Sequence, residues 1–93
     1  MVTAIVLINA QRNKIPETTQ ALAELKGVTE VYSIAGPYDI AAIIRVKSNE
    51  DLADLVTRKM LKLDGIEKST TLIAFETLSS FDLERMFSLG LEK

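Results

Sequence analysis

The sequence predicts an α+β domain whose elements follow the order β-α-β-β-α-β. Short runs rich in β-branched residues alternate with two stretches of helical periodicity, and glycine or proline marks most of the junctions between them. Right-handed crossovers would place both helices on one face of an antiparallel four-stranded sheet. This arrangement is the ferredoxin-like pattern.

The first half of the chain predicts a strand, a helix and a second strand. Val2–Asn9 is an aliphatic and β-branched strand. A helix is expected over about Pro16–Lys26, because proline suits a first helical turn, where its missing N–H would be unpaired anyway. Gly27 then supplies the left-handed cap that ends such a helix. Val28–Ala35 follows as the second strand.

The second half repeats the pattern. Asp39–Lys47 predicts the third strand, and Ser48–Asp51 resembles a capping box that opens a second helix. Apolar residues then keep helical spacing along one face: Leu52, Leu55, Val56, Met60 and Leu63. Asp64-Gly65 ends this helix, and Ile66–Glu76 is the fourth strand.

The last residues predict a short third helix. Ser79 and Ser80 precede an apolar segment that ends near Gly90, with Asp82 in the expected first turn. We therefore divide the chain into a domain over residues 1–78 and a helical tail over residues 79–93. The tail packs either on its own domain or on a neighbouring subunit, and we favour the neighbour.

Three of the predicted strands are apolar on both faces. On the first strand, one face carries Val2, Ala4, Val6 and Ile8, and the other carries Thr3, Ile5 and Leu7. On the third strand, the two faces carry Ile40, Ala42, Ile44 and Val46, and Ala41 and Ile43. On the fourth strand, they carry Leu72 and Ala74, and Ile73 and Phe75. Strands of this kind are covered on both sides, and two helices cover only one. The open face therefore predicts a dimer formed by sheet-on-sheet packing.

Composition narrows the function classes. The chain has 93 residues, enough for one small domain, and 47% of them are hydrophobic. It contains no cysteine and no histidine, so no disulfide or thiolate is available, and the commonest acid–base and metal-binding side chain is missing. We expect a cytoplasmic protein with no metal and no cofactor. The longest apolar run, Ala4–Ile8, is too short to cross a membrane.

Charge argues against direct nucleic-acid binding. The formal net charge is -2, and acidic and basic residues are interspersed. Arg58, Lys59 and Lys62 form one local basic cluster at the end of the predicted second helix. Because cations at a helix C-terminus complement its dipole, we interpret this cluster as a solvated helix end. No basic stripe interleaves with aromatic residues as in nucleic-acid-binding surfaces.

Three segments together resemble a known family. They are the Gly27-Val28…Glu30…Tyr32 segment, the Gly-x-Tyr-Asp turn formed by Gly36, Tyr38 and Asp39, and the run Gly65–Ile73. Over roughly Val2–Thr77 the chain is similar to the effector domain of the Lrp/AsnC transcriptional regulators. That domain is also called the RAM domain, for regulation of amino acid metabolism. Family regulators carry a DNA-binding helix-turn-helix before it, whereas this sequence starts at the effector domain and resembles a stand-alone RAM protein.

The resemblance implies a homo-oligomer that binds an amino acid. In the family, dimers form through their sheets and assemble into rings of typically eight or ten subunits, with amino acids bound where dimers meet. It implies ligand contacts for Gly36, Tyr38, Asp39, Ser69 and Thr71, and for Thr70 by proximity alone. Full-length Lrp/AsnC regulators are possible partners, and neither nucleic acid nor membrane is an expected direct partner.

The chemistry of these residues fits such a site. Gly36 lets a ligand approach the backbone, and Pro37 pre-sets the turn. The Asp39 carboxylate can accept hydrogen bonds from an α-ammonium group, and the hydroxyls of Ser69 and Thr71 can donate to a carboxylate. Each residue also has a structural explanation, since Asp39 can stabilise the turn through the backbone and Ser, Thr and Gly-Pro are ordinary strand and hairpin residues.

Three functions remain open at this point. The first is an amino-acid-responsive regulatory module, involved in amino acid metabolism and transcription, that acts without touching DNA itself. The second is a small dimeric enzyme of the isomerase or monooxygenase type, which the absence of histidine argues against. The third is a ring-forming scaffold with no small-molecule ligand.

Overall fold

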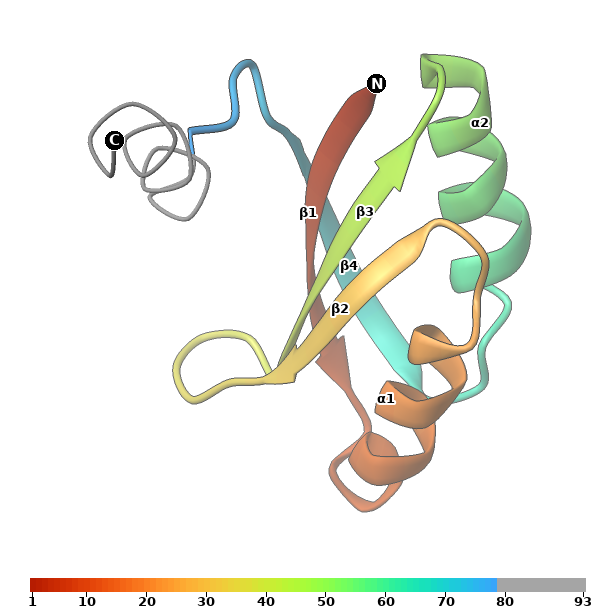
Figure 1. Cartoon of the computed structure of the whole chain (residues 1–93). Coiled ribbons are helices and arrows are strands. Elements are labelled where there is room, and N and C mark those ends of the chain that lie inside the picture. The colour runs from red at the N-terminus through yellow and green to blue at the C-terminus, as the bar shows by residue number, and fades with distance from the viewer. Residues whose placement is uncertain (79–93) are drawn as a thin grey trace, which may run out of the picture.

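The computed structural model describes residues 1–78 and shows the predicted element order (Figure 1). The elements are β1 (Val2–Ala10), a 3₁₀ turn η1 (Arg12–Lys14), α1 (Ile15–Ala23), β2 (Val28–Ser33), β3 (Ile40–Val46), α2 (Asn49–Asp54), its π-helical continuation η2 (Leu55–Met60) and β4 (Ile66–Ile73). The four strands form one antiparallel sheet in the order β2-β3-β1-β4. This confirms the ferredoxin-like α+β fold. Within residues 1–78, no helix is both long and apolar enough to cross a membrane.

Strand β1 lies in the middle of the sheet and determines which residues share a face. Ile5 pairs with Ile43 on β3 and with Leu72 on β4. Because directly opposed residues of antiparallel strands point to the same side, these three side chains form one row. Val6 and its partner Ala42 point to the opposite side and are fully buried.

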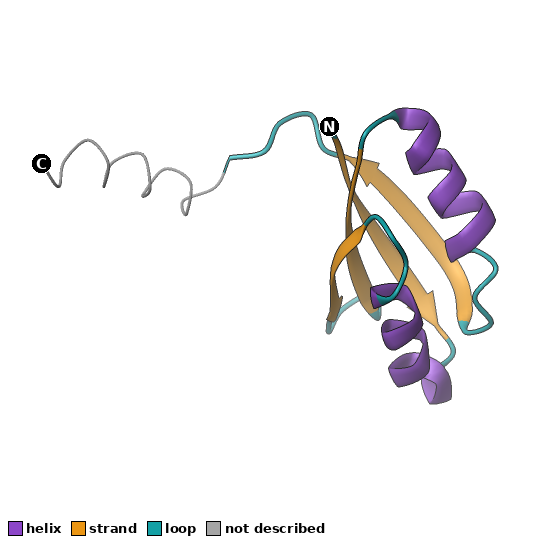
Figure 2. Ribbon diagram, turned by 45° about the vertical axis from the view of Figure 1, so that its right-hand side comes forward, coloured by secondary structure: helices purple, strands orange, loops and turns teal. Residues whose placement is uncertain are grey.

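Both helices pack on that buried side (Figures 1 and 2). The core between helices and sheet consists of Ala4, Val6, Ile8, Ala10, Ile40, Ala42 and Ile44 from the strands and Leu22, Leu52, Leu55 and Met60 from the helices. On the other side no element of residues 1–78 covers the sheet, and Ile5 and Ile43 are only half-buried. This confirms the prediction that the two helices cover only one of the two apolar faces of the sheet.

The second helix changes pitch at its middle. It is α-helical over Asn49–Asp54 and π-helical from Leu55 to Met60, where the Leu61 N–H donates to the Val56 carbonyl at 3.0 Å. The wider turn brings Leu55 and Met60, five positions apart, into the same core, with exposed fractions of 3% and 1%. Helical spacing predicted the helix but not this change of pitch.

Several elements are shorter than expected. The first helix ends at Ala23, three residues before the expected Lys26. The fourth strand ends at Ile73, three residues before the expected Glu76, and Ile73 pairs with Ala4 near the start of β1. The last bond along this edge is the Ala74 N–H to the Thr3 carbonyl, at 2.8 Å. The expected C-terminal helix lies outside the described residues.

Two glycines allow the elements to pack closely. Gly27 has φ +103°, the left-handed conformation expected of it, and an added Cβ would lie 3.0 Å from both Leu55 Cδ2 and Val46 Cγ1. At Gly65 an added Cβ would lie 2.1 Å from Thr18 Oγ1. A side chain at Gly65 would require Thr18 to move, and one at Gly27 would crowd Leu55 and Val46 and strain the left-handed backbone.

Candidate ligand-binding site at the end of strand β1

Three segments from different parts of the chain meet where β1 ends. They are the end of β1, the turn between β2 and β3, and the first residues of β4. A pocket of about 490 Å³ lies between them, lined by Asn9, Pro37, Tyr38, Lys68, Ser69 and Thr70. A volume of this size lies within the range of small-molecule sites.

The turn is tied to β1 by backbone hydrogen bonds. The Ile34 N–H donates to the Asp39 carbonyl at 2.9 Å and closes the hairpin. The Asp39 N–H donates to the Ile8 carbonyl, also at 2.9 Å. The side-chain amide of Asn9 donates to the Pro37 carbonyl at 2.9 Å. The pocket wall formed by this turn is therefore held in place by β1.

The Asp39 carboxylate has a structural partner. Its Oδ2 accepts the backbone N–H of Ala10 at 2.9 Å. The Ala10 N–H lies on the β3 side of β1, as the Ile8 carbonyl does, and it lies beyond Ile8, the last β1 residue that pairs with β3. Asp39 thus stabilises the end of β1 through a backbone hydrogen bond. A structural role of this kind is the alternative to ligand binding that follows from the sequence alone.

The structure brings together some of the expected ligand residues. Tyr38, Ser69 and Thr70 line the pocket. Gly36, with φ +132°, and Asp39 belong to the turn but not to the pocket lining.

Thr71 is separated from the pocket by strand geometry. It pairs with Val6, whereas Thr70 pairs with Leu7, and neighbouring strand residues point to opposite faces. Thr71 is exposed on the helix side of β4, and Thr70 points to the open side of the sheet. The three-hydroxyl segment therefore divides between two faces.

Sequence analysis missed two lining residues, Asn9 and Lys68. They pair directly across β1 and β4, so their side chains share a face. Lys68 immediately precedes the expected Ser69, and Asn9 is the last residue of the expected first strand. Only the register shows that they meet. The pocket thus combines an ammonium group, an amide, a phenol and the Thr70 hydroxyl, which suit a carboxylate-bearing ligand.

Comparison with known proteins assigns the class. A domain with this fold and a polar pocket beside a Gly-Pro turn is compatible with a small-molecule-binding module. The model of the Lrp/AsnC ligand-binding domain family matches residues 3–82. The chain therefore belongs to this family.

The relatives agree with this assignment. An uncharacterized helix-turn-helix transcriptional regulator of Pyrococcus furiosus is 42% identical over 83 residues, which are 88% of this chain and 55% of that regulator. The chain thus spans about half the length of the curated relatives it matches.

Solved structures show the same fold. A crystal structure of a Thermus thermophilus protein has 46% identity and a TM-score of 0.80, covering 85% of this chain and 99% of that one. AsnC of E. coli has 25% identity and a TM-score of 0.78, covering 84% and 53%. The family and its relatives are transcriptional regulators and not enzymes.

Proposed function

We propose that this domain is an oligomeric amino-acid-binding effector module that takes part in regulating amino acid metabolism through transcription. The observation that supports this proposal is the pocket lined by Tyr38, Lys68, Ser69 and Thr70 in a chain that belongs to the Lrp/AsnC ligand-binding family. Its donors match the carboxylate that all amino acids share.

The proposed binding mode divides the ligand between the two walls of the pocket. Lys68 and the Thr70 hydroxyl, which share the open face of β4, bind the carboxylate, with charge-assisted hydrogen bonds from Lys68. Asp39 keeps its bond to the Ala10 N–H, and a carboxylate has lone pairs left for an α-ammonium group. Gly36 and Tyr38 complete the ligand environment that we carry over as a proposal from the family resemblance, whereas Thr71, on the opposite face of β4, takes no part in this binding mode.

The open face of the sheet supports assembly. Ile5, Ile43 and Leu72 form an adjacent apolar row there, and Leu72 is 47% exposed. We propose that a second copy covers this face to form a dimer, and that dimers associate into a ring. Thr70 lies on the same face, so the pocket opens beside the proposed contact. Ligand binding can then bias assembly by its different affinity for the two states.

We further propose that DNA contact is left to partner chains. The net charge of -2 does not favour a phosphate backbone, and full-length Lrp/AsnC regulators carry the same domain type. Mixed rings would let an amino acid sensed by this chain alter a DNA-bound assembly in the cytoplasm.

A thermal-shift screen against the twenty amino acids tests the ligand. We expect a subset to raise the melting temperature, because a ligand that binds only the folded state stabilises it. Thr70→Ala should reduce the shift, and Thr57→Ala, a threonine on the exposed face of η2, should not.

Two results would count against this proposal. One is an unchanged melting temperature with every amino acid, which would leave a scaffold without a ligand as the better account. The other is a full shift retained by a folded Lys68→Gln, Thr70→Ala double variant, which would place the ligand elsewhere.

A further inference from the structure

A second pocket of about 490 Å³ lies at the opposite end of the sheet. It is bounded by the connection between α1 and β2, the end of β3 and the second helix, and Met1 lines it where β1 begins. Since β1 carries Asn9 at its other end and rises about 3.3 Å per residue, this pocket is roughly 25 Å from the candidate amino acid site. It belongs to a different part of the molecule.

Positive charge gathers in this pocket. Lys26, Lys47 and Lys59 line it, against one acidic residue, Asp51, whereas Arg45, also in the lining, directs its side chain to the open face of the sheet as its partner Thr3 does. The whole chain has 11 basic and 13 acidic residues, so the local excess runs against the overall charge. The ion pairs within residues 1–78 are Lys14 with Asp64 and Arg58 with Asp54, and none of the three pocket lysines takes part. Their charge is available to a ligand.

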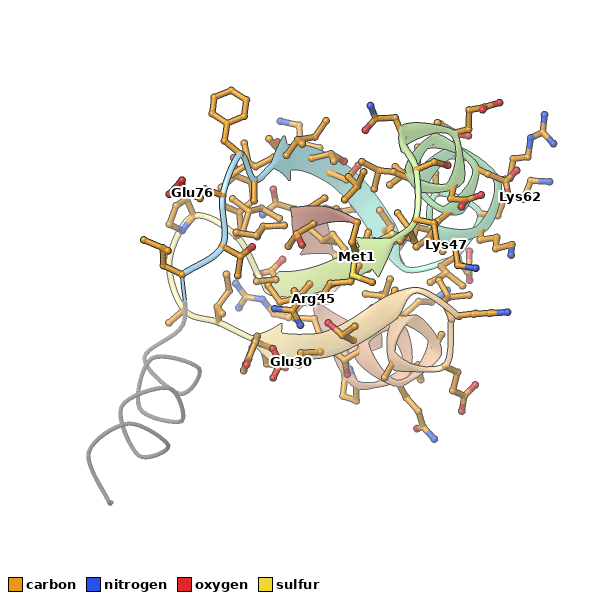
Figure 3. The ribbon with its side chains drawn as sticks, turned by 45° about the horizontal axis from the view of Figure 1, so that its top comes forward. Met1, Glu30, Arg45, Lys47, Lys62 and Glu76 are labelled. Atoms are coloured by element: carbon orange, nitrogen blue, oxygen red, sulfur yellow. The ribbon has the colours of Figure 1, made fainter. Side chains whose placement is uncertain are left out.

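The pocket cations come from separate elements that the backbone holds together. Lys26 lies before the left-handed Gly27, whose carbonyl accepts the Arg45 N–H at 2.9 Å. Lys47 follows β3 and lies beside the ribbon of the second helix in Figure 3, and Lys59 comes from η2. The connection after α1 is thereby attached to the end of β3.

A solvated helix end accounts for only part of this cluster. Lys59 lies in the last turn of η2, where a cation complements the helix dipole. Lys47 lies two residues before the first helical residue of α2, where the dipole favours an anion. The helix dipole therefore explains the position of Lys59, but it does not explain why Lys47 lines the same pocket.

We propose that this pocket binds a small molecule carrying at least two negative charges, of the phosphate-ester class. Lysine is a common phosphate ligand as a point charge, and several lysines can share the oxygens of one phosphate group. The apolar side chains of Met1 and Val46 line the same pocket and offer a surface for the uncharged part of such a molecule. Such a site would give the domain a second effector, in addition to the amino acid of the proposed function.

Calorimetric titration of the whole chain with ADP and with pyrophosphate, at low and at physiological ionic strength, tests this site. Lys47→Gln with Lys59→Gln should weaken binding by about tenfold or more, because each change removes a charge-assisted contact. The matched control is Arg12→Gln with Lys62→Gln, which removes the same charge from exposed positions outside this pocket. The control pair should change affinity by less than about threefold.

Asp51→Asn gives a readout that misfolding cannot imitate. Removing the one carboxylate of the pocket should tighten binding of ADP severalfold, because the repulsion of the phosphates is lost. If neither ADP nor pyrophosphate binds at millimolar concentration, the proposal is overturned. An equal loss of affinity in the two variant pairs would also overturn it. Binding of succinate but not of pyrophosphate would overturn the phosphate assignment. Duplex DNA binding that is lost in Lys47→Gln, Lys59→Gln would assign the surface to nucleic acid instead.

Discussion

At the scale of single residues, the Asp39 carboxylate stabilises the fold next to the candidate ligand-binding site. Its Oδ2 accepts the Ala10 N–H beyond the last β1 residue that pairs with β3, and the Asp39 N–H donates to Ile8. A hydrogen bond to a charged group contributes more than one between neutral groups, and an unmatched N–H at a half-buried strand end is costly. Loss of this side chain should therefore affect stability as well as any ligand.

Two substitutions at Asp39 separate these roles. Asp39→Ala removes the acceptor of the Ala10 N–H and should lower the free energy of unfolding by about 1–3 kcal/mol. Asp39→Asn keeps an oxygen acceptor of the same shape and should retain more than about half of that stability. Urea denaturation measures both. If Asp39→Ala unfolds at the wild-type urea concentration, the hydrogen bond does not stabilise the domain.

The candidate site was only partly predictable from the residues. The Gly36–Asp39 turn and the hydroxyl segment mark two chain regions with polar side chains next to apolar strands, and the structure does bring these regions together. Which residues face the pocket depends on pairing register, and register is a tertiary property. For this reason the sequence could not separate Thr70 from Thr71, nor include Asn9 and Lys68.

At the scale of elements, the second helix begins with the expected cap. The Ser48 Oγ accepts the Asp51 N–H at 3.1 Å, and Glu50 and Asp51 lie in the first turn, where the helix dipole favours negative charge. The cap matters here because the α-helical segment has only six residues before the π-helical turn.

Ser48→Ala should destabilise the domain by about 0.5–2 kcal/mol, because the Asp51 N–H loses its acceptor. Ser48→Asp should restore most of this loss, since aspartate is an equally good cap. Thermal unfolding followed by circular dichroism compares the three proteins. Equal melting temperatures for wild type and Ser48→Ala would contradict the account of this helix start.

An ion pair connects the two crossover segments. Lys14, at the start of α1, donates to Asp64 in the loop before β4. The hydrogen bond and the opposite charge lower the pKa of the Asp64 carboxyl below its ordinary value of 3.8 and raise the pKa of Lys14 above 10.5. The pair is solvent-accessible, so its contribution is screened by water and salt.

The pH dependence follows from these shifts. The Asp64 contribution is present above its unfolded pKa of 3.8 and is lost as pH falls through the lowered folded value. The Lys14 contribution is present below its unfolded pKa of 10.5 and is lost as pH rises through the raised folded value. The melting-temperature gap between wild type and Asp64→Asn should be widest between about pH 5 and pH 10 and should narrow as pH falls below 3.8 toward the lowered folded pKa of Asp64. A gap independent of pH would show that the charge pair does not stabilise the fold.

Element type and order followed from the sequence, because periodicity, caps and glycine positions agree with one another. Gly27 adopts the expected left-handed conformation, and Ser48 caps the helix expected there. Element ends were less predictable, since they depend on partners: β4 ends at Ile73, which pairs with Ala4 near the start of β1. The π-helical turn has no local sequence signal, and it exists because Leu55 and Met60 both reach the core.

At the scale of the whole molecule, the domain has one well-packed layer and one open layer. The helices cover the side on which Ala4, Val6 and Ile8 have no exposed surface. On the other side Ile5 and Ile43 remain half-buried, next to an exposed Leu72. Burial of this row by a second copy would remove apolar surface from water and place a second wall beside the pocket at Thr70. Assembly and amino acid binding are then parts of one equilibrium.

Native mass spectrometry during titration with the amino acid that gives the largest thermal shift tests this coupling most directly. It compares wild type, Ile5→Asp, which places a charge in the apolar row, and Thr57→Asp, which adds the same charge on the exposed face of η2. Wild type and Thr57→Asp should be oligomers that bind the amino acid and change their assembly with it, whereas Ile5→Asp should be a folded monomer that binds at least about tenfold more weakly. A monomeric wild type, or equal affinity in monomeric Ile5→Asp, would contradict the account.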